Sequence, residues 1–212
     1  LDMRFRPQFI FCLLFVLSTT SIALSQPSIT PKPAKKHKPD DTVGVVKGVL
    51  ITYRDFHYQL KSVLHDHLSE LKGDSVSGEE LTKFVNIAWD KMVGDVIVEQ
   101  EIKKRGLSIS KEETIKRMIA DPPELIKQSF TDSLGVLHSK ELQAFLESPV
   151  QDSLRDKVVI YYETSFELAD FLKKIAPKAT TDAEKQKALD AWIAKEVAHT
   201  AIDDRRVAFG YY

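Results

Sequence analysis

The sequence predicts a mostly α-helical fold: a multi-helix core with a small β-sheet formed by an N-terminal hairpin and a C-terminal strand. Apolar residues recur at helical spacing along most of the chain, and Trp89 and Trp192 fit such apolar faces. Two short β-rich runs, residues 43–46 and 49–51, are separated by a Lys-Gly pair, which is a hairpin signal. Apolar and polar side chains alternate from Val207 onward, and this alternation predicts the final strand.

Composition and charge are those of a globular protein with its own hydrophobic core. Hydrophobic residues make up 43% of the 212 residues, and charged residues make up 29%. The formal net charge of −1 gives no electrostatic argument for nucleic-acid binding. Eight glycines are few for a β-sandwich or barrel, folds that are rich in tight turns. Because Cys12 is the only cysteine, we expect no disulfide and no thiolate metal ligand in the folded domain.

The N-terminus has the pattern of a secretory signal peptide over residues 1–25. Arg4 and Arg6 precede an apolar run at residues 9–17, and small residues precede Gln26. The run is shorter than the ~20 apolar residues of a membrane-spanning helix, so we expect cleavage and no stable membrane insertion afterwards. An uncleaved anchor is the alternative.

Residues 26–42 predict a disordered linker. They contain four prolines, four lysines and almost no apolar side chains, a composition that cannot bury a core. Contact of these lysines with anionic lipid is an alternative role. The folded domain is then expected over residues 43–212.

Capping residues mark the helices of this domain. The longest helix, residues 79–105, contains Gly94, which costs up to ~1 kcal/mol relative to Ala and therefore indicates close packing. Ser110 opens the next helix, with Glu113 as its capping-box partner. The predicted capping residues are Thr52, Ser110, Asp121 and Ser139, and further helices are predicted to begin at about Glu79, at Pro149, and at Thr181 or Asp182.

Three segments in a fixed order carry a family resemblance. Residues 45–56 read VVKGVLITYRDF, residues 89–113 read WDKMVGDVIVEQEIKKRGLSISKEE, and residues 121–146 read DPPELIKQSFTDSLGVLHSKELQAFL. Their hairpin motif, glycine-stopped long helix and D-x-x-G turn together resemble the N-terminal core of the SurA and PpiD family of periplasmic chaperones. The resemblance covers roughly residues 43–175, and less closely the last helix and strand.

The resemblance implies an exported, ATP-independent chaperone, a holdase, in the periplasm. Its partners would be apolar segments of unfolded envelope or outer-membrane proteins, and it implies no cofactor. Full members of the family often insert parvulin domains at the position of residues 176–180. Because no parvulin segment stands in this sequence, we do not expect an enzyme. Two alternatives stay open: an isomerase-related protein with residual or partner-supplied peptidyl-prolyl isomerase activity, and a dedicated assembly partner of one envelope protein.

Aromatic residues of the helix that follows Pro149 are the candidates for client contact. Tyr161 and Tyr162 are neighbours and point about 100° apart on a helix, so both cannot face one core. Tyr161, Tyr162 and Phe166 are therefore the predicted client-binding residues. Partial burial at the rim of the core is the alternative.

No pattern of residues predicts a catalytic or metal site. Among the six histidines, His65 and His67 are two positions apart and would point about 200° apart on a helix, so they cannot readily share a metal. Paired carboxylates such as Glu112 and Glu113 are adjacent in sequence and lie at predicted helix starts. Helix capping and the helix dipole explain acidic residues there, so we predict neither catalytic nor metal-binding residues.

Overall fold

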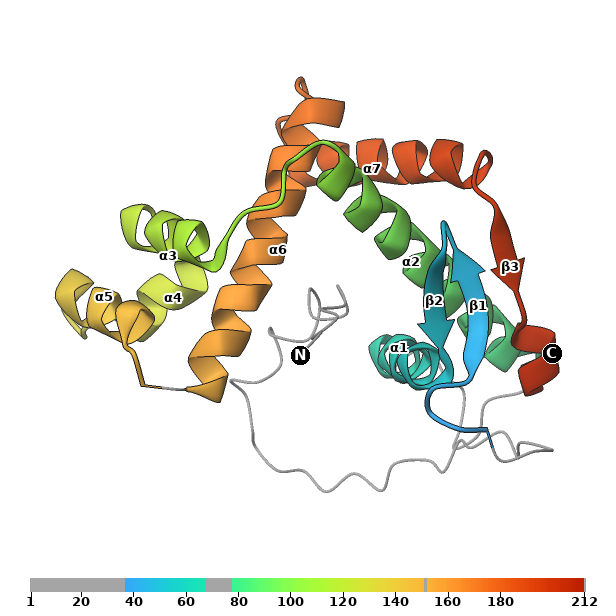
Figure 1. Cartoon of the computed structure of the whole chain (residues 1–212). Helices are drawn as coiled ribbons and strands as arrows, with labels where there is room; N and C mark the ends of the chain where they lie inside the picture. The colour runs from blue at the N-terminus through green and yellow to red at the C-terminus, as the bar shows by residue number, and fades with distance from the viewer. Residues whose placement is uncertain (1–36, 68–77, 151, 212) are drawn as a thin grey trace.

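The computed structural model describes residues 37–67, 78–150 and 152–211, so the predicted signal peptide and most of the predicted linker lie outside it. The described chain is mostly helical with one three-stranded sheet, which confirms the predicted fold class (Figure 1). No helix within these ranges is long and apolar enough to cross a membrane. The elements in chain order are β1 (Thr42–Val46), β2 (Val49–Thr52), α1 (Tyr53–Asp66), α2 (Gly78–Lys104), α3 (Lys111–Ala120), α4 (Glu124–Ser129), α5 (Ser139–Glu147), α6 (Ser153–Ile175), α7 (Asp182–Val197), β3 (Ile202–Asp204) and the 3-10 helix η3 (Arg206–Phe209).

The sheet joins the two ends of the folded region, as the sequence predicts. Its strand order is β2-β1-β3, and both outer strands run antiparallel to β1. Lys47 and Gly48 connect β1 to β2 with positive φ angles of 49° and 80°, the geometry that a two-residue type I′ hairpin turn requires. On the other side of β1, Gly44 lies opposite Asp204 of β3.

The end of the chain differs from the predicted alternating strand. Only Ile202–Asp204 is extended, and the residues from Arg206 form η3, which stops at Gly210 with a φ of 74°. Tyr211 then returns to the core, where it is 5% exposed. The alternation from Val207 onward does not form a strand because Arg206 requires a turn that directs its side chain inward.

Arg206 is a buried cation that ties the chain end to α2. Its guanidinium donates to the carbonyl of Val85 over 3.2 Å and to the side chain of Asn86 over 3.0 Å, and it pairs with Asp204 over 2.6 Å. The same group lies 4.8 Å from the ring of Trp89. These partners compensate its desolvation and hold β3 and η3 against the long helix.

Residues 37–41, which belong to the predicted linker, are part of the folded body. The ring of His37 lies 5.5 Å from Tyr53 and 4.3 Å from Phe209, and Tyr53 in turn stacks on His57 and lies near Tyr211. We call these five residues the clasp, because they hold the start and the end of the described chain together. The linker boundary predicted at residue 42 is therefore wrong: the ordered chain begins by residue 37.

Most of the buried apolar residues form two separate cores. The sheet lobe contains the sheet, α1, the first part of α2 and the chain end, packed around Phe56 and Trp89. The helical lobe contains α3, α4, α5 and the first half of α6, packed around Met118 and Leu142. Figure 1 shows the two lobes on opposite sides of the molecule, connected through α2, α6 and α7.

A third cluster joins the lobes where α2, α6 and α7 meet. It is built on Ile102, Phe171 and Leu189, one residue from each helix. Beside it, α7 crosses α2 at Gly94, where a Cβ atom would lie 3.4 Å from the side chain of Ile193. The close packing predicted at this glycine is thus confirmed.

Three helices begin at their predicted capping residues, because backbone N–H groups of the first turn are free to donate to the capping side chain. The side chains of Thr52, Ser110 and Thr181 accept hydrogen bonds from the backbones of Asp55, Glu113 and Glu184, and Thr181 forms a full capping box. At Ser110 only one half of the predicted capping box forms: the backbone N–H of Glu113 donates to the Ser110 hydroxyl. The side chain of Glu113 does not return to the backbone of Ser110 but accepts a hydrogen bond from Arg117 over 3.1 Å.

Two other predicted capping residues and one predicted helix start are wrong. Asp121 ends α3, and Pro123 is the cap of α4, because the prolines after Asp121 have no N–H for its carboxylate. The cap of α5 is His138, one residue earlier than predicted. The cap of α6 is Asp152, whose carboxylate accepts from two backbone N–H groups, so the helix begins after Pro149 and not at it.

Candidate functional site

The three predicted client-binding residues lie on α6 but differ in exposure. Tyr162 is only 6% exposed and belongs to the core of the helical lobe. Tyr161 and Phe166 are half-buried at the edge of that core. The rings of Tyr161 and Tyr162 meet edge to face at 5.0 Å, and Tyr162 lies 6.0 Å from Phe166. Tyr162 is therefore a core residue that supports the other two aromatic rings.

A row of apolar side chains that includes Tyr161 follows one face of α6. Leu154 and Leu168 lie seven residues before and after Tyr161, which is about two helical turns in each direction, so the three share one face. Leu154 is exposed, and Tyr161 and Leu168 are half-buried. We call Leu154, Tyr161 and Leu168 the α6 row; it runs from the tip of the helical lobe toward the junction of α2, α6 and α7.

The opposite flank of α6 is occupied by α3 and the segment that precedes it. Asp156 pairs with Lys111 over 2.9 Å, and Asp170 pairs with Arg117 over 2.7 Å. Between them, Glu167 accepts the backbone N–H of Ile109 over 2.9 Å. Burial raises the pKa of Glu167, yet these three contacts match acidic groups on α6 with donors. This flank is a structural interface. The α6 row lies on the other side of the helix, where Leu154 is exposed and Tyr161 and Leu168 pack partly against the neighbouring clusters.

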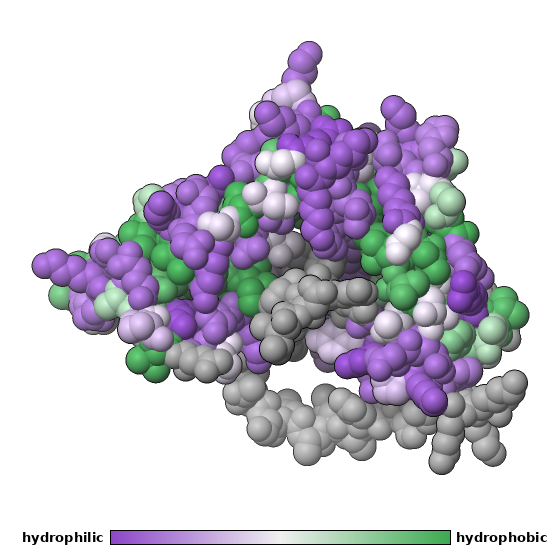
Figure 2. Space-filling view, in the orientation of Figure 1, coloured by the Kyte–Doolittle hydropathy of each residue, from purple (hydrophilic) through white to green (hydrophobic). Residues whose placement is uncertain are grey.

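Exposed large apolar residues concentrate near the same part of the molecule. Four of the seven such residues in the described chain belong to the helical lobe or to its junction with α6. Leu134 is 86% exposed and Val150 is 70% exposed. Figure 2 shows apolar surface on this lobe between hydrophilic areas. The four residues are Leu134, Val136, Val150 and Leu154.

A rigid turn presents two of these side chains. The carboxylate of Asp132 accepts the backbone N–H groups of Leu134 and Val136, each over 2.9 Å. His138 lies 3.3 Å from the other oxygen of Asp132 and 3.2 Å from Glu141, and these hydrogen bonds raise the pKa of His138. The polar groups of this turn are thus used within it, while its apolar side chains point into solvent.

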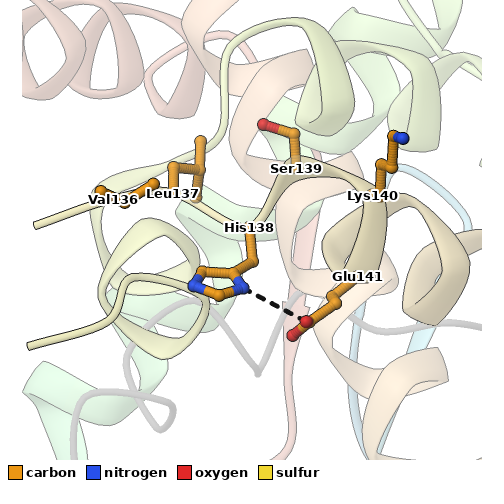
Figure 3. A pocket seen from close by; sticks show the side chains of 6 residues that line it. All are labelled: Val136, Leu137, His138, Ser139, Lys140 and Glu141. Carbon is orange, nitrogen blue, oxygen red and sulfur yellow. Dashed lines mark hydrogen bonds and ion pairs between the residues drawn. The ribbon is translucent and has the colours of Figure 1, made fainter.

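Next to this turn lies an open depression of about 410 Å³. Its walls come from the single run of residues 136–141, and Figure 3 shows His138 beside Glu141 at its edge. A depression walled by one short run does not enclose a small molecule as typical ligand pockets do. Within the described ranges, no group of three or more histidines and carboxylates could hold a metal ion.

Sequence reasoning missed most of the exposed apolar set. It assigned no functional role to Leu134, Val136, Val150 or Leu154. A signal was present: Leu134 and Val136 lie in and beside the D-x-x-G turn, where polar side chains are the usual choice.

Comparison with known proteins identifies a family model that covers more than half of the chain. The model of the SurA-like N-terminal domain matches residues 2–146, a range that extends from the N-terminus to the end of α5. No curated protein and no solved structure matches the chain.

Proposed function

Because the chain belongs to the family of SurA-like N-terminal domains, we propose that it is an ATP-independent holdase of the cell envelope. It would bind apolar segments of unfolded envelope or outer-membrane proteins, weakly and reversibly, and keep them from aggregating. In this proposal the chain needs no metal or cofactor and catalyses no reaction. Its place would be the periplasm, reached through the signal peptide expected at residues 1–25.

The observation that carries the proposal is the exposed apolar surface of the helical lobe and α6. Scattered single apolar residues are normal on a protein surface, but a concentration of them on one lobe is typical of an interaction site. The set of Leu134, Val136, Val150 and Leu154, extended by Tyr161, offers several small apolar contacts without a deep pocket. Such a surface suits clients that share hydrophobicity but no common sequence.

The strength of binding expected from this surface is modest. Burial of apolar area contributes roughly 25 cal/mol per Å², and much of it is offset by the ordering of an unfolded segment. Dissociation constants in the micromolar range or weaker follow from that balance. Weak binding is what a holdase needs, since its clients must leave without an energy source.

The test is suppression of aggregation by the purified protein. An unfolded outer-membrane protein is diluted from denaturant, and light scattering is followed with increasing amounts of the chain. We expect suppression at a several-fold molar excess. No effect at that excess would contradict the proposal, and a stable one-to-one complex with a single envelope protein would favour the assembly-partner alternative.

Two variants locate the activity. The first replaces Leu134, Val136 and Val150 with serine in the helical lobe, and the second replaces Leu50 and Val207, which are exposed on the sheet lobe, with serine. Exposed substitutions of this kind usually change stability by less than about 0.5 kcal/mol. We expect the first variant to lose most of the suppression and the second to retain it.

A further inference from the structure

One ring nitrogen of His57, in the clasp, is buried without a hydrogen-bond partner. The centroids of the His57 and Tyr53 rings lie 5.7 Å apart, and the ring planes differ by 13°. The Nδ1 atom of His57 is shielded from solvent, and no partner for it lies among the described residues. A neutral imidazole tolerates this position, because Nδ1 can stay without a proton. A protonated imidazole carries an N–H on both nitrogens, so the charge would bring a buried donor that has no acceptor.

The groups packed around His57 do not balance a positive charge. Within the described part of the chain, the charge that acts on His57 is that of Lys61, one helical turn further along α1. The phenol of Tyr211 stays neutral in acid, since burial raises its pKa. Burial and the nearby Lys61 lower the pKa of His57. The closed clasp therefore favours the neutral ring.

The other histidine of the clasp has a carboxylate beside it. Nδ1 of His37 lies 3.9 Å from the carboxylate of Asp41, so a proton on His37 gains an ion pair. The neighbouring Asp40 is paired with Arg54 at the start of α1. Protonation therefore disfavours the closed clasp at His57, whereas at His37 it adds an attraction.

Residues 37–41 are held on the first turn of α1, one turn before His57. The backbone N–H of Tyr53 donates to the carbonyl of Asp41 over 2.7 Å, and that of Arg54 donates to the carbonyl of Pro39 over 3.0 Å. Both N–H groups would lose these acceptors if residues 37–41 left the helix.

The end of the described chain is held by rings and, separately, by Arg206. Phe209 stacks on Tyr53 at 5.8 Å, and Tyr211 meets Phe56 edge to face at 4.9 Å. Arg206 binds α2 through contacts that involve none of these rings. Figure 1 shows this part of the chain, in red, on the side of the sheet lobe that faces away from the helical lobe. Loss of the ring contacts would release residues 207–211, while Arg206 keeps the preceding strand in place.

We propose that the clasp is a pH-sensitive switch, in which protonation of His57 detaches residues 37–41 and 207–211 from α1. The rings of the clasp then become accessible, so the sheet lobe gains an apolar surface in acid that it lacks at neutral pH. This surface is separate from the exposed apolar residues of the helical lobe, so the switch goes beyond the proposed holdase site.

Proton binding alone sets the upper limit of the effect. In the open clasp His57 titrates near its ordinary pKa of about 6.5, whereas in the closed clasp its pKa is lower. As the pH falls below 6.5, the open form binds a proton that the closed form does not bind, so the equilibrium moves toward the open form. Between pH 7.5 and pH 5 the open population can rise by at most about thirtyfold, the limit for a closed form that stays unprotonated.

Hydrogen–deuterium exchange of the full chain at pH 5 and pH 7.5, corrected for intrinsic exchange rates, measures the opening. We expect the amides of Tyr53, Arg54 and Tyr211 to exchange at least about fivefold faster at pH 5, because their acceptors are lost in the open clasp. The amides of α5, in the helical lobe, should not show this increase.

Two matched variants assign the effect to one histidine. His57→Phe keeps an aromatic ring beside Tyr53 and removes the group that binds the proton, so its clasp amides should exchange alike at both pH values. His37→Phe makes the same change at the other histidine of the clasp and should keep the acid response. A nuclear magnetic resonance titration of the parent needs no substitution: the ring signal of His57 should change over the same pH range as the amide signal of Tyr211.

Three results would overturn the inference. The first is equal exchange of the clasp amides of the parent at both pH values. The second is an acid response that His57→Phe retains, and the third is one that His37→Phe abolishes. If His57→Phe does not fold, the titration decides, and a His57 ring signal that changes in a different pH range from the Tyr211 amide refutes the switch. The holdase proposal rests on the helical lobe and is tested without a change of pH, so the two can fail separately.

Discussion

Replacing Gly44 with alanine should destabilise the sheet lobe, because β1 has no room for a methyl group. A Cβ atom at this position would lie 2.6 Å from the carbonyl oxygen of Asp203 and 3.0 Å from Cζ3 of Trp89, and closer still to Cη2 of that ring. Carbon atoms pack best at about 3.5–4.0 Å, so both neighbours would have to move. Neither can do so easily: one is the backbone of β3, and the other is a buried ring held under Arg206.

The expected magnitude follows from two opposing effects. Overpacking of a rigid site costs about 1–3 kcal/mol and sometimes more, and the rigidity around Gly44 favours the upper end. Replacement of glycine by alanine also lowers the conformational entropy of the unfolded chain, which offsets about 0.4–1 kcal/mol of this cost. The net loss should be about 2 kcal/mol or more, which corresponds to a melting temperature lowered by roughly 4–8 °C for a chain of this size.

Denaturant and thermal unfolding of the Gly44→Ala variant measure this loss. Gly78→Ala is the matched control, because no atom of the described residues outside its own helix lies within 4 Å of the Cβ position at this first residue of α2. The control should be neutral or slightly stabilising. If Gly44→Ala unfolds within about 0.5 kcal/mol of the parent, the packing argument for β1, Trp89 and β3 is wrong.

Three further changes test other parts of the structure. Arg206→Ala should cost about 2–3 kcal/mol in urea unfolding, since it removes the guanidinium that donates to the Val85 carbonyl and pairs with the Asp204 carboxylate. A loss below about 1 kcal/mol would show that this residue does not tie the chain end to α2. Tyr162→Ala should lower the free energy of unfolding by about 3 kcal/mol, because the Tyr162 ring is buried. Tyr161→Ala should lower it by about 1 kcal/mol, since this ring is half-buried, and should weaken client binding in the aggregation assay. Equal stability losses would mean that the two rings do not differ in burial as described. Burial raises the pKa of Asp95 to about 6, so the carboxyl favours folding in its protonated form, and that contribution is lost as the pH rises from about 4 through about 6. Asp95→Asn should therefore stabilise the protein at pH 7 by at most about 3 kcal/mol and flatten the stability profile between pH 4 and 7, and a profile unchanged by the substitution would refute this assignment.

Local signals in the sequence predict much of the fold. Thr52, Ser110 and Thr181 cap their helices as expected, since each has a hydroxyl and a free N–H within reach. The long helix around Trp89 and the hairpin turn at Gly48 are also predicted, because periodicity and glycine placement determine them within a few residues. Residues close in sequence determine these features, so the amino-acid sequence alone predicts them.

The misplaced features depend on contacts between distant segments. The alternation after Val207 does not form a strand because Arg206 finds its partners about 120 residues earlier in α2. His37 is ordered because Phe209, at the other end of the chain, packs on it. A proline-rich composition near the N-terminus predicts a linker and carries no information about that partner.

In the candidate site, too, some features follow from local sequence and others depend on contacts between distant segments. Helical spacing places Tyr161 and Tyr162 on α6, but it cannot determine which of the two faces the helical lobe. That is decided by the docking of α3 on one flank of α6, through Lys111 and Arg117, and by the packing of Tyr162 into the core of the helical lobe. Exposure of Leu134 likewise follows from the turn that Asp132 holds, which spacing alone does not reveal.

The most direct test of the proposed holdase function is a crosslinking map with an unfolded, apolar peptide that carries a photo-reactive residue. Irradiation of the complex followed by mass spectrometry identifies the residues of the chain that the peptide touches. The account predicts crosslinks at Leu134, Val150, Leu154 and Tyr161, and their loss when excess unfolded outer-membrane protein competes. Crosslinks confined to the sheet lobe, or none above an unreactive control peptide, would contradict it.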